Sequence, residues 1–188
     1  MNLRPYQHAA VEDIRAHYRR GTKRVLLHLA TGAGKTVVFS YILKSLVERG
    51  NTGLMVVHGR HLVDQAADRL EREGVPHGVI MNGRTTKLGM PIYVCAIDTL
   101  RARNLYPPAD LIVIDEAHMA VSKGYADFLA AYPDAYLLPV TATPYTKKSM
   151  RHLADQVVAP IGIGDLVTLG FLVPPRYIVP VNHDLSGV

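Results

Sequence analysis

Two short polar stretches of this sequence carry side chains suited to phosphate chemistry. The first reads A-T-G-A-G-K-T at residues 30–36 and lies between an apolar run and a segment with helical apolar spacing. This order predicts a strand, a glycine loop and a helix. Glycine lets successive backbone N–H groups turn toward an anion without Cβ clashes, and the start of the helix adds its positive dipole end. We expect Lys35 to neutralise the β- and γ-phosphates of a nucleotide and the Thr36 hydroxyl to bind a magnesium ion.

The glycine loop departs from the strict phosphate-loop pattern at one position, where Leu29 replaces the first glycine. A glycine-rich turn that binds nothing is therefore an alternative. The pair Lys35–Thr36 favours phosphate binding over that alternative, because it stands between the expected strand and the expected helix. The stretch indicates a nucleoside triphosphate, and it does not indicate how the energy is used.

The second polar stretch, D-E-A-H at residues 115–118, directly follows the apolar run Leu111–Ile114. Two adjacent carboxylates at a strand end repel each other unless a cation lies between them. With magnesium and a glycine loop nearby, Asp115 would hold the ion, and Glu116 would position and deprotonate the attacking water. The alternative is a solvated loop with ordinary surface acids, which leaves the preceding strand and Lys35 unexplained.

The composition is that of a globular domain, with 188 residues of which 48% are apolar and 20% are charged. This length suffices for one well-packed domain and hardly for two. The formal charge of +5 is a weak indication of a polyanionic partner. Cys95 is the single cysteine, which excludes a disulfide framework and fits a reducing cytosol. The N-terminus does not read as a signal peptide and no apolar run reaches membrane-spanning length, so we expect a cytoplasmic protein without a membrane partner.

Apolar periodicity, with glycine and proline between segments, predicts alternating helices and strands. Helices are expected at Pro5–Arg20, about 35–49, Arg60–Glu73, Tyr125–Ala131, Thr146–Val158 and Ile163–Leu169. Strands are expected at Arg24–Leu29, Thr52–Val57, His77–Met81, Pro91–Ala96, Leu111–Ile114 and Ala135–Val140. The segment Phe171–Pro180 has too many prolines for a central strand and is expected to be an edge strand or a linker.

Strands that alternate with helices indicate an α/β fold with a mostly parallel central sheet and helices on both faces. Ligands of such sheets bind at the carboxyl ends of the strands. Both polar stretches fall at such an end, so we expect them to contribute to one site.

Three motifs stand in order along this sequence: A-T-G-A-G-K-T, D-E-A-H and T-A-T-P at residues 141–144. Together they resemble the first RecA-like domain of superfamily 2 helicases and translocases. L-R-P-Y-Q at residues 3–7 and G-F-L-V-P-P at residues 170–175 are most similar to bacterial and phage DNA-repair and restriction motors, such as the RadD and UvsW groups and the type III restriction subunits. The resemblance implies a single RecA-like P-loop NTPase domain over residues 1–160. Residues 161–188 would be a short helix and a proline-rich edge strand or linker toward an absent second RecA-like domain.

The resemblance also implies roles in a site for ATP and Mg²⁺. Gln7 would read the adenine edge, because an amide can bind N6 and N7 together, and Arg4 or Tyr6 would pack on the base. Without the resemblance, Gln7 would be an ordinary residue at the start of a helix. The phosphates would be bound by Thr31, Gly32, Ala33, Gly34, Lys35 and Thr36. Coupling of this site to nucleic acid would run through His118, Thr141 and Thr143.

Two residues are expected to contact nucleic-acid phosphates. Arg60 lies in a segment that resembles the family's first strand-backbone motif, and a solvated residue at a helix start is the alternative. Thr99 lies in A-I-D-T-L, where the family has a T-Q-T-L-like stretch. Asp98 replaces the usual amide there, and a carboxylate is unfavourable beside a phosphate backbone.

These assignments predict the N-terminal ATP-binding motor domain of an ATP-dependent DNA helicase or translocase, in the cytosol of a bacterium or a phage-infected host. The sequence has no second set of parallel strands and no arginine motif of the Q-x-x-G-R-x-x-R kind, so we expect half of a motor that hydrolyses ATP slowly by itself. One alternative is an RNA helicase domain of the same superfamily, which equal binding to RNA and DNA would favour. Another is a non-motor module that binds ATP or nucleic acid, against which intact Lys35, Asp115 and Glu116 argue.

Overall fold

Helices and strands alternate along the chain in the computed structural model, which describes residues 2–84, 86–120, 123–144, 150 and 153–174. The helices are α1 (Pro5–Arg19), α2 (Lys35–Glu48), α3 (Arg60–Arg72), α4 (Ile97–Ala102), α5 (Lys123–Ala130) and α6 (Ile163–Thr168), and one 3-10 turn is η1 (Ala117–Met119). The strands are β1 (Val25–His28), β2 (Gly53–Val57), β3 (His77–Ile80), β4 (Ile92–Ala96), β5 (Leu111–Ile114), β6 (Tyr136–Thr141) and β7 (Gln156–Val158).

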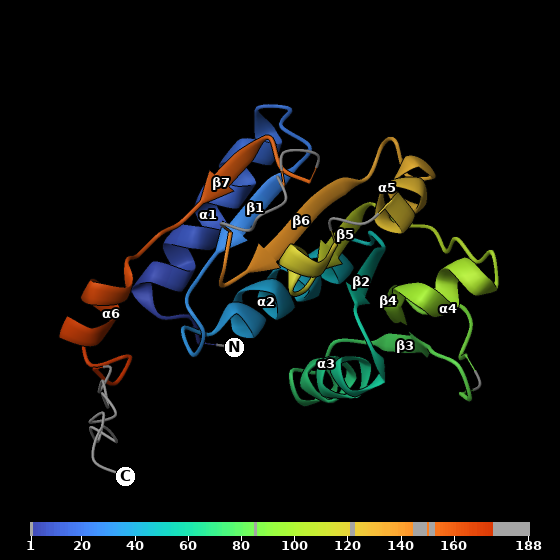
Figure 1. The fold of residues 1–188 in the computed structure, drawn as a ribbon, viewed down its shortest axis with the longest axis horizontal. Coiled ribbons are helices and arrows are strands. Elements are labelled where there is room, and N and C mark those ends of the chain that lie inside the picture. Colours follow the sequence, from blue (N-terminus) through green and yellow to red (C-terminus); the bar gives the residue numbers. More distant parts are fainter. Residues whose placement is uncertain (1, 85, 121–122, 145–149, 151–152, 175–188) are drawn as a thin grey trace, which may run out of the picture.

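The strands form one seven-stranded sheet in the order β3-β4-β2-β5-β6-β1-β7 (Figure 1). Every neighbouring pair is parallel, which confirms the predicted α/β fold. Because β6 lies between β5 and β1, the carboxyl ends of these three strands are neighbours at one edge of the sheet. The glycine loop, the D-E-A-H stretch and the T-A-T-P stretch follow those three ends.

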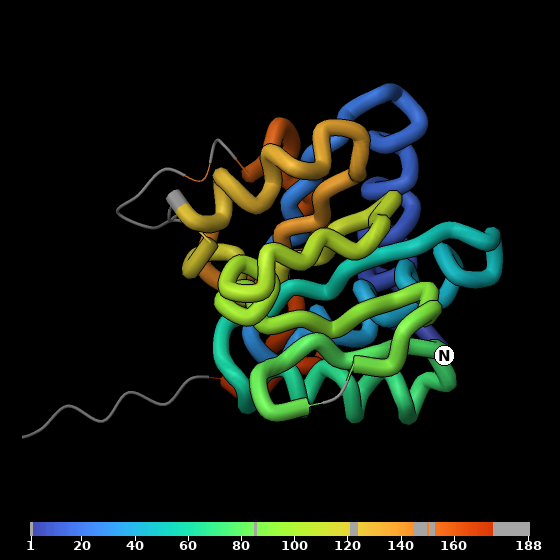
Figure 2. Tube along the Cα trace, turned by 90° about the vertical axis from the view of Figure 1, so that its right-hand side faces the viewer, coloured from blue at the N-terminus to red at the C-terminus, as the bar shows by residue number. Residues whose placement is uncertain are grey.

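Side chains of each strand point alternately to the two faces of the sheet, as strand geometry requires. In β2, Met55 and Val57 join the core that packs against α1, α2, α3 and α6. Leu54 and Val56 join the core formed with α4, α5 and η1. All four side chains are fully buried, which explains why such strands read as continuous apolar runs. Figure 2 shows α3 and α5 on opposite sides of the strands.

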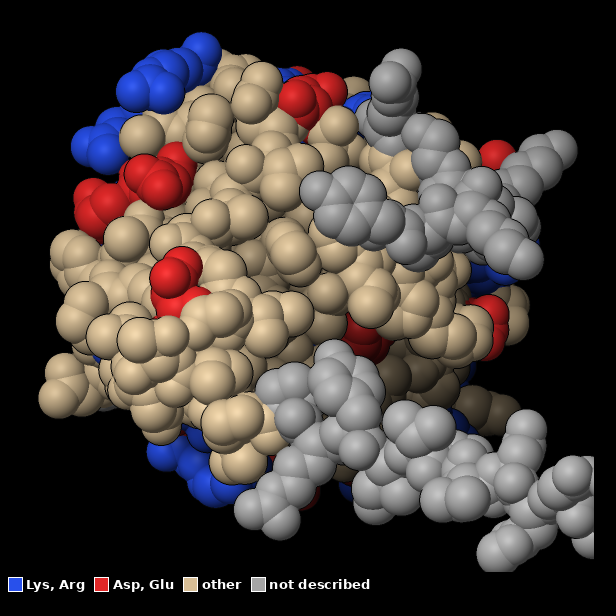
Figure 3. Space-filling view, turned by 60° about the vertical axis from the view of Figure 1, so that its left-hand side comes forward, with Lys and Arg blue, Asp and Glu red and all other residues tan. Residues whose placement is uncertain are grey.

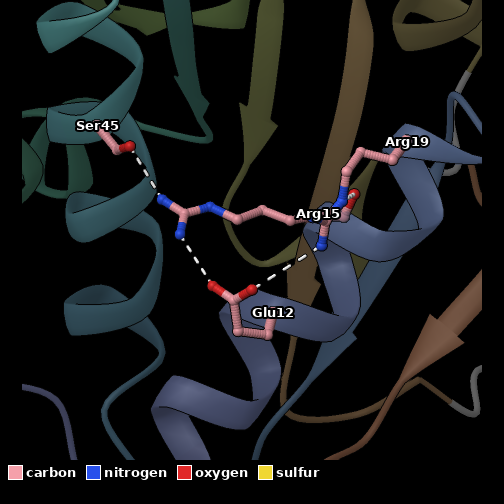
Figure 4. A network of polar contacts seen from close by, with 4 residues as sticks. All are labelled: Glu12, Arg15, Arg19 and Ser45. Atoms are coloured by element: carbon pink, nitrogen blue, oxygen red, sulfur yellow. Dashed lines mark hydrogen bonds and ion pairs between the residues drawn. The ribbon is translucent and has the colours of Figure 1, made fainter.

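A polar network joins α1 to α2 (Figure 4). The Arg15 guanidinium donates to Glu12 Oε1 at 3.0 Å and to Ser45 Oγ of α2 at 2.9 Å. Arg19 lies 3.9 Å from the second carboxylate oxygen of Glu12. Partly exposed ion pairs contribute only about 0–1 kcal/mol each, so the network orients the two helices more than it stabilises them. It fixes α1 against the helix that begins at Lys35.

The β7 side of the molecule is partly apolar. Figure 3 turns this side forward, and most of the described surface there is uncharged. Val157 of β7 is 57% exposed, and Ile163 and Leu169 at the two ends of α6 are 62% and 60% exposed. Within the described ranges, no helix has the length and apolarity needed to cross a membrane.

Two sequence-based expectations about the elements require correction. The helix predicted over Thr146–Val158 is wrong at Gln156–Val158, which is strand β7 and pairs with β1 in parallel. The β-branched residues Val157 and Val158 suit a strand, and pairing with Leu26 and Leu27 supplies the long-range contact. Residues 146–149 and 151–152 of that prediction lie outside the described residues.

The segment Phe171–Pro180 was expected to be an edge strand or a linker. Residues 171–174 form no strand, and residues 175–180 lie outside the described residues. Helix α4 has no counterpart among the expected helices.

The burial of Phe39 in α2 predicts that its replacement by alanine strongly destabilises the fold. Phe39 is fully buried behind the glycine loop, so Phe39→Ala should lower the free energy of unfolding by about 3–5 kcal/mol through lost burial and the cavity left behind. Leu88 is 80% exposed, so Leu88→Ala should change it by less than about 0.5 kcal/mol. Denaturant titration followed by circular dichroism measures both. Equal stabilities of the two variants would contradict the packing described.

Candidate functional site

The glycine loop joins β1 to α2 at the carboxyl edge of the sheet. Gly32 and Gly34 have φ of 81° and 82°, in the left-handed region that glycine adopts without strain. A Cβ at Gly34 would clash with Gln7 Nε2, and a Cβ at Gly32 would lie 3.0 Å from Leu172 Cδ2. Both positions therefore favour glycine for their backbone conformation, and a Cβ there would also force the Gln7 or the Leu172 side chain to move. Since α2 begins at Lys35, helix geometry leaves the N–H groups of Lys35 and Thr36 without a helical partner, while those of Val37 and Val38 donate to the Gly34 carbonyl at 3.0 Å and 3.3 Å.

The N-terminal segment holds this loop through the carbonyl of Ala33. The Tyr6 hydroxyl donates to it at 2.8 Å, and Gln7 Nε2 donates to it at 3.1 Å. Gln7 Oε1 accepts a hydrogen bond from Arg4 N at 3.0 Å. Tyr6 and Gln7 are only 6% and 3% exposed. The loop is thus anchored to α1 by buried hydrogen bonds.

The residues expected to meet a base lie together at this end of α1. Arg4 is exposed, and its guanidinium lies 4.5 Å from the centre of the Phe171 ring. The ring of Tyr6 is buried, which leaves Arg4 as the surface on which a base could stack. The Gln7 amide oxygen and nitrogen each already make one hydrogen bond. Hydrogen bonds to adenine would therefore use the second N–H of the amide nitrogen and the second lone pair of the amide oxygen.

Phe171 and Leu172 contact this region, and sequence reasoning missed them. The Phe171 ring lies 5.4 Å from the Tyr6 ring at an angle of 58°. The available signal was the G-F-L-V-P-P stretch, which was interpreted as a mark of the family resemblance and as the start of an edge strand or linker, and not as part of the nucleotide site.

Asp115 and Glu116 follow β5 at the same edge of the sheet. Burial raises the pKa of Asp115 above its ordinary value, while a hydrogen bond from Glu116 N to Asp115 Oδ1 at 2.9 Å lowers that pKa. The Glu116 charge raises the pKa of Asp115 further, and the positive charge of Lys35 lowers it. The charges of Lys35 and Asp115 therefore influence each other across the ends of β1 and β5, which lie on either side of β6, so the two polar stretches lie at the same edge of the sheet.

Glu116 has an unusual backbone conformation, with φ 49° and ψ 51°. This left-handed conformation costs a residue with a Cβ roughly 1–2 kcal/mol. In the described part of the chain, Asn104 is the other non-glycine residue with positive φ. Strain of this kind clusters at functional sites, where surrounding contacts maintain it. Here the Glu116 carbonyl accepts from Met119 N at 2.9 Å at the start of η1.

His118 stands between Glu116 and Thr141. Its Nδ1 lies 3.3 Å from Glu116 Oε2 and 3.3 Å from Thr141 Oγ1. Thr141 is fully buried at the end of β6, and its Oγ1 accepts a hydrogen bond from Thr143 N at 3.1 Å. Thr143 thus joins this chain of contacts through its backbone. A proton on Nδ1 can be directed to the carboxylate or to the hydroxyl, so the two are linked.

The side chains present fit a magnesium ion only if a ligand supplies further oxygens. Within the part of the chain that the structure describes, no three His, Cys, Asp or Glu side chains are grouped so as to hold a metal. Asp115 and the Thr36 hydroxyl are the oxygen donors expected here. Magnesium is commonly held in this way, by one or two carboxylates together with phosphate oxygens and water.

The residues expected to contact nucleic acid meet at the turn after β3. Arg60 is exposed at the first position of α3, and a Cβ at Gly83 would lie 3.6 Å from its Nη2. Thr99 is 7% exposed, and its Oγ1 accepts a hydrogen bond from Asn82 N at 3.2 Å. The Thr99 hydroxyl therefore holds the turn. Arg84, which follows this turn, pairs with Asp64 of α3 at 2.9 Å.

Comparison with known proteins gives one family and several relatives. Residues 1–146 match the family described as the type III restriction enzyme, res subunit. The chain is 29% identical to IRC3 of Saccharomyces cerevisiae, by its name a candidate ATP-dependent helicase, over 99% of this chain and 30% of IRC3.

Two solved structures share the fold. The UvsW helicase from bacteriophage T4 matches with a TM-score of 0.71 at 18% identity, over 84% of this chain and 60% of that chain. A nuclease-deletion mutant of the type ISP restriction-modification enzyme LlaGI, in complex with a DNA substrate mimic, matches with a TM-score of 0.72 at 18% identity. That match covers 91% of this chain and 21% of LlaGI.

The raised pKa of Asp115 predicts a pH-dependent cost to stability. Below the ordinary aspartate pKa of 3.8, the Asp115 carboxyl is neutral in both the folded and the unfolded state and does not affect stability. As the pH rises above that value, the carboxyl ionises more readily in the unfolded state than in the folded state. The free energy of unfolding therefore falls as the pH rises. Asp115→Asn keeps an oxygen for the Glu116 N–H and stays neutral. It should therefore raise the Tm at pH 7 in EDTA, and the gain should shrink as the pH falls toward 4. Asp127→Asn is the control, because that side chain is exposed on α5. A gain independent of pH would contradict this account.

Proposed function

Because this chain belongs to the family of the type III restriction enzyme res subunit, we propose that it is the N-terminal ATP-binding motor domain of a DNA helicase or translocase. The observation that carries the proposal is the strand order: the loop with Lys35 and the pair Asp115–Glu116, far apart in the sequence, follow β1 and β5 on either side of β6 at one edge of the sheet, and His118 links Glu116 to Thr141 at the end of β6. A fold with a glycine loop alone would need none of these contacts.

In the proposed reaction, water attacks the γ-phosphorus of ATP and the bond to the β-phosphate oxygen breaks, giving ADP and phosphate. The N–H groups at the start of α2 and the Lys35 ammonium bind the phosphates, and Thr36 and Asp115 would hold a magnesium ion. Magnesium, when bound, would neutralise charge on the β- and γ-phosphates. The Glu116 carboxylate orients the water and takes its proton.

The contacts of His118 provide a route from hydrolysis to nucleic acid. When Glu116 gains a proton its negative charge is lost, and its attraction for His118 weakens. His118 can then bond Thr141 at the end of β6 more fully. We infer that this rearrangement changes how the carboxyl edge of the sheet meets a nucleic-acid strand, with Arg60 on a phosphate and Thr99 supporting the turn beside it.

DNA is the proposed substrate, single-stranded or duplex. Its support is the restriction family, the UvsW likeness and the LlaGI likeness, since LlaGI was solved with a DNA substrate mimic. RNA remains the alternative, because RecA-like domains bind mainly the backbone that both polymers share. The chain spans less than a third of IRC3, and we propose that the parent motor contains a second RecA-like domain that supplies arginine fingers. The buried thiol of Cys95 is consistent with the cytosolic location that we propose.

Glu116→Gln tests the chemistry. It should leave the Kd for ATP within about twofold of the wild type and lower steady-state hydrolysis by about a hundredfold or to the detection limit, because the general base is lost. Lys35→Ala is the comparison variant and should weaken binding itself. A coupled assay for phosphate release and a fluorescent ATP analogue give the two readouts. Unchanged hydrolysis in Glu116→Gln would favour a non-motor binding module.

Arg60→Ala tests the nucleic-acid contact. It should weaken single-stranded DNA binding by about three- to fivefold, since one phosphate contact is lost, and leave ATP binding unchanged. Arg72→Ala is the matched control, because Arg72 lies at the other end of α3 and bonds the Asp68 carbonyl. Fluorescence anisotropy with DNA and RNA of the same sequence measures both variants. Equal binding of RNA and DNA by the wild type would count against DNA as the specific substrate.

A further inference from the structure

The segment that follows α6 is fixed in place by that helix. The backbone N–H groups of Phe171 and Leu172 both donate to the Leu166 carbonyl, at 2.8 Å and 3.1 Å. Leu166 is fully buried against the sheet. The position of residues 171 and 172 is therefore set by the core.

Two adjacent side chains of this segment point inward while their neighbours point outward. Phe171 and Leu172 pack against the core, whereas Leu169 and Val173 are 60% and 86% exposed. Adjacent residues that both turn inward are not explained by strand or helix periodicity. The reason for their placement lies in what they contact.

Phe171 contacts the start of α1. The Arg4 guanidinium lies over its ring at 4.5 Å from the ring centre, and the Tyr6 ring packs on it at 5.4 Å. Arg4 also donates to the Tyr6 hydroxyl at 3.2 Å, which itself holds the Ala33 carbonyl. Phe171 thereby supports one face of Arg4, and Arg4 remains exposed to a base.

Leu172 contacts the glycine loop directly. Its Cδ2 would be 3.0 Å from a Cβ at Gly32, so it lies against the backbone of that residue. The loop is held at Ala33 from the α1 side and at Gly32 from the α6 side. Two independent contacts thus restrain the peptide groups expected to face the phosphates.

We propose that Phe171 and Leu172 are positioning residues of the nucleotide site, Phe171 for the base through Arg4 and Leu172 for the phosphates through Gly32. This inference rests on the proposed ATP site. It adds a second wall, built by the segment after α6, to a site otherwise formed by the loop and the two following motifs. It also assigns different roles to two neighbouring side chains, and the effect of each on ligand affinity can be measured separately.

The test compares the affinities of ATP, which has a base, and inorganic tripolyphosphate, which has none. Each affinity is measured by competition with a fluorescent ATP analogue for the 188-residue chain. The variants are Phe171→Ala, Phe171→Tyr, Leu172→Ala and the control Val173→Ala. Phe171→Ala should weaken ATP binding by about threefold or more, through the lost cation–π support of Arg4, and leave tripolyphosphate binding unchanged. Phe171→Tyr should restore ATP binding. Leu172→Ala should weaken both ligands by a similar factor, and Val173→Ala should change neither.

For Phe171→Ala, the ratio of the two affinities distinguishes positioning from a general loss of structure, because partial unfolding lowers both affinities by the same factor. For Leu172→Ala, which should lower both affinities, thermal unfolding followed by circular dichroism makes this distinction: weakened binding in a variant that is fully folded at the assay temperature indicates positioning. The proposal is overturned if Phe171→Ala weakens ATP and tripolyphosphate equally, or if Phe171→Ala and Leu172→Ala both bind like Val173→Ala. A wild-type chain that binds neither ligand better than Lys35→Ala would instead overturn the proposed function, and this inference with it.

Discussion

The hydrogen bonds that Tyr6 and Gln7 donate to the Ala33 carbonyl determine where the glycine loop lies. A glycine-rich loop has little conformational preference of its own, and β1 and α2 fix only its two ends. The two bonds are buried, where a polar group left without its partner costs about 1–3 kcal/mol. The loop therefore depends on α1 for its conformation at Ala33. Helix α1 is held in turn by its buried side chains Ala10, Val11 and Ile14, and Arg15 orients it against α2.

The strand order explains why residues from distant parts of the sequence meet. Placing β6 between β5 and β1 brings the ends of these strands side by side, so Asp115, Thr141 and the glycine loop need only short extensions to reach one another. The strained backbone of Glu116 belongs to this arrangement. It turns the chain sharply from β5 into η1 and sets the carboxylate beside His118, which an extended residue at that point would not do.

Most of the fold follows from local pattern, because strands buried on both faces leave apolar runs that are easy to recognise. The Leu111–Ile114 strand has the predicted bounds for this reason. β7 shows where local pattern fails. Its three residues become a strand by pairing with β1, and no neighbouring residue signals that contact.

Residue types and their order gave the expectation of one phosphate site, since glycine, lysine and paired carboxylates have few alternative uses at strand ends. The contacts within and around that site depend on tertiary structure. Gln7 reaches Ala33, Thr99 reaches Asn82 and Leu172 reaches Gly32 only after the sheet has formed. These are pairs of ordinary residues, so their partners could not be read from spacing.

The edge strands of the sheet influence whether molecules of this protein associate with one another. An open sheet edge with apolar side chains can recruit a strand from another chain and begin aggregation. β7 provides such an edge, with Val157 exposed, but it is only three residues long. An incoming strand could make few backbone hydrogen bonds there before β7 ends. The brevity of the last strand thus limits edge-to-edge growth on the most apolar side of the sheet.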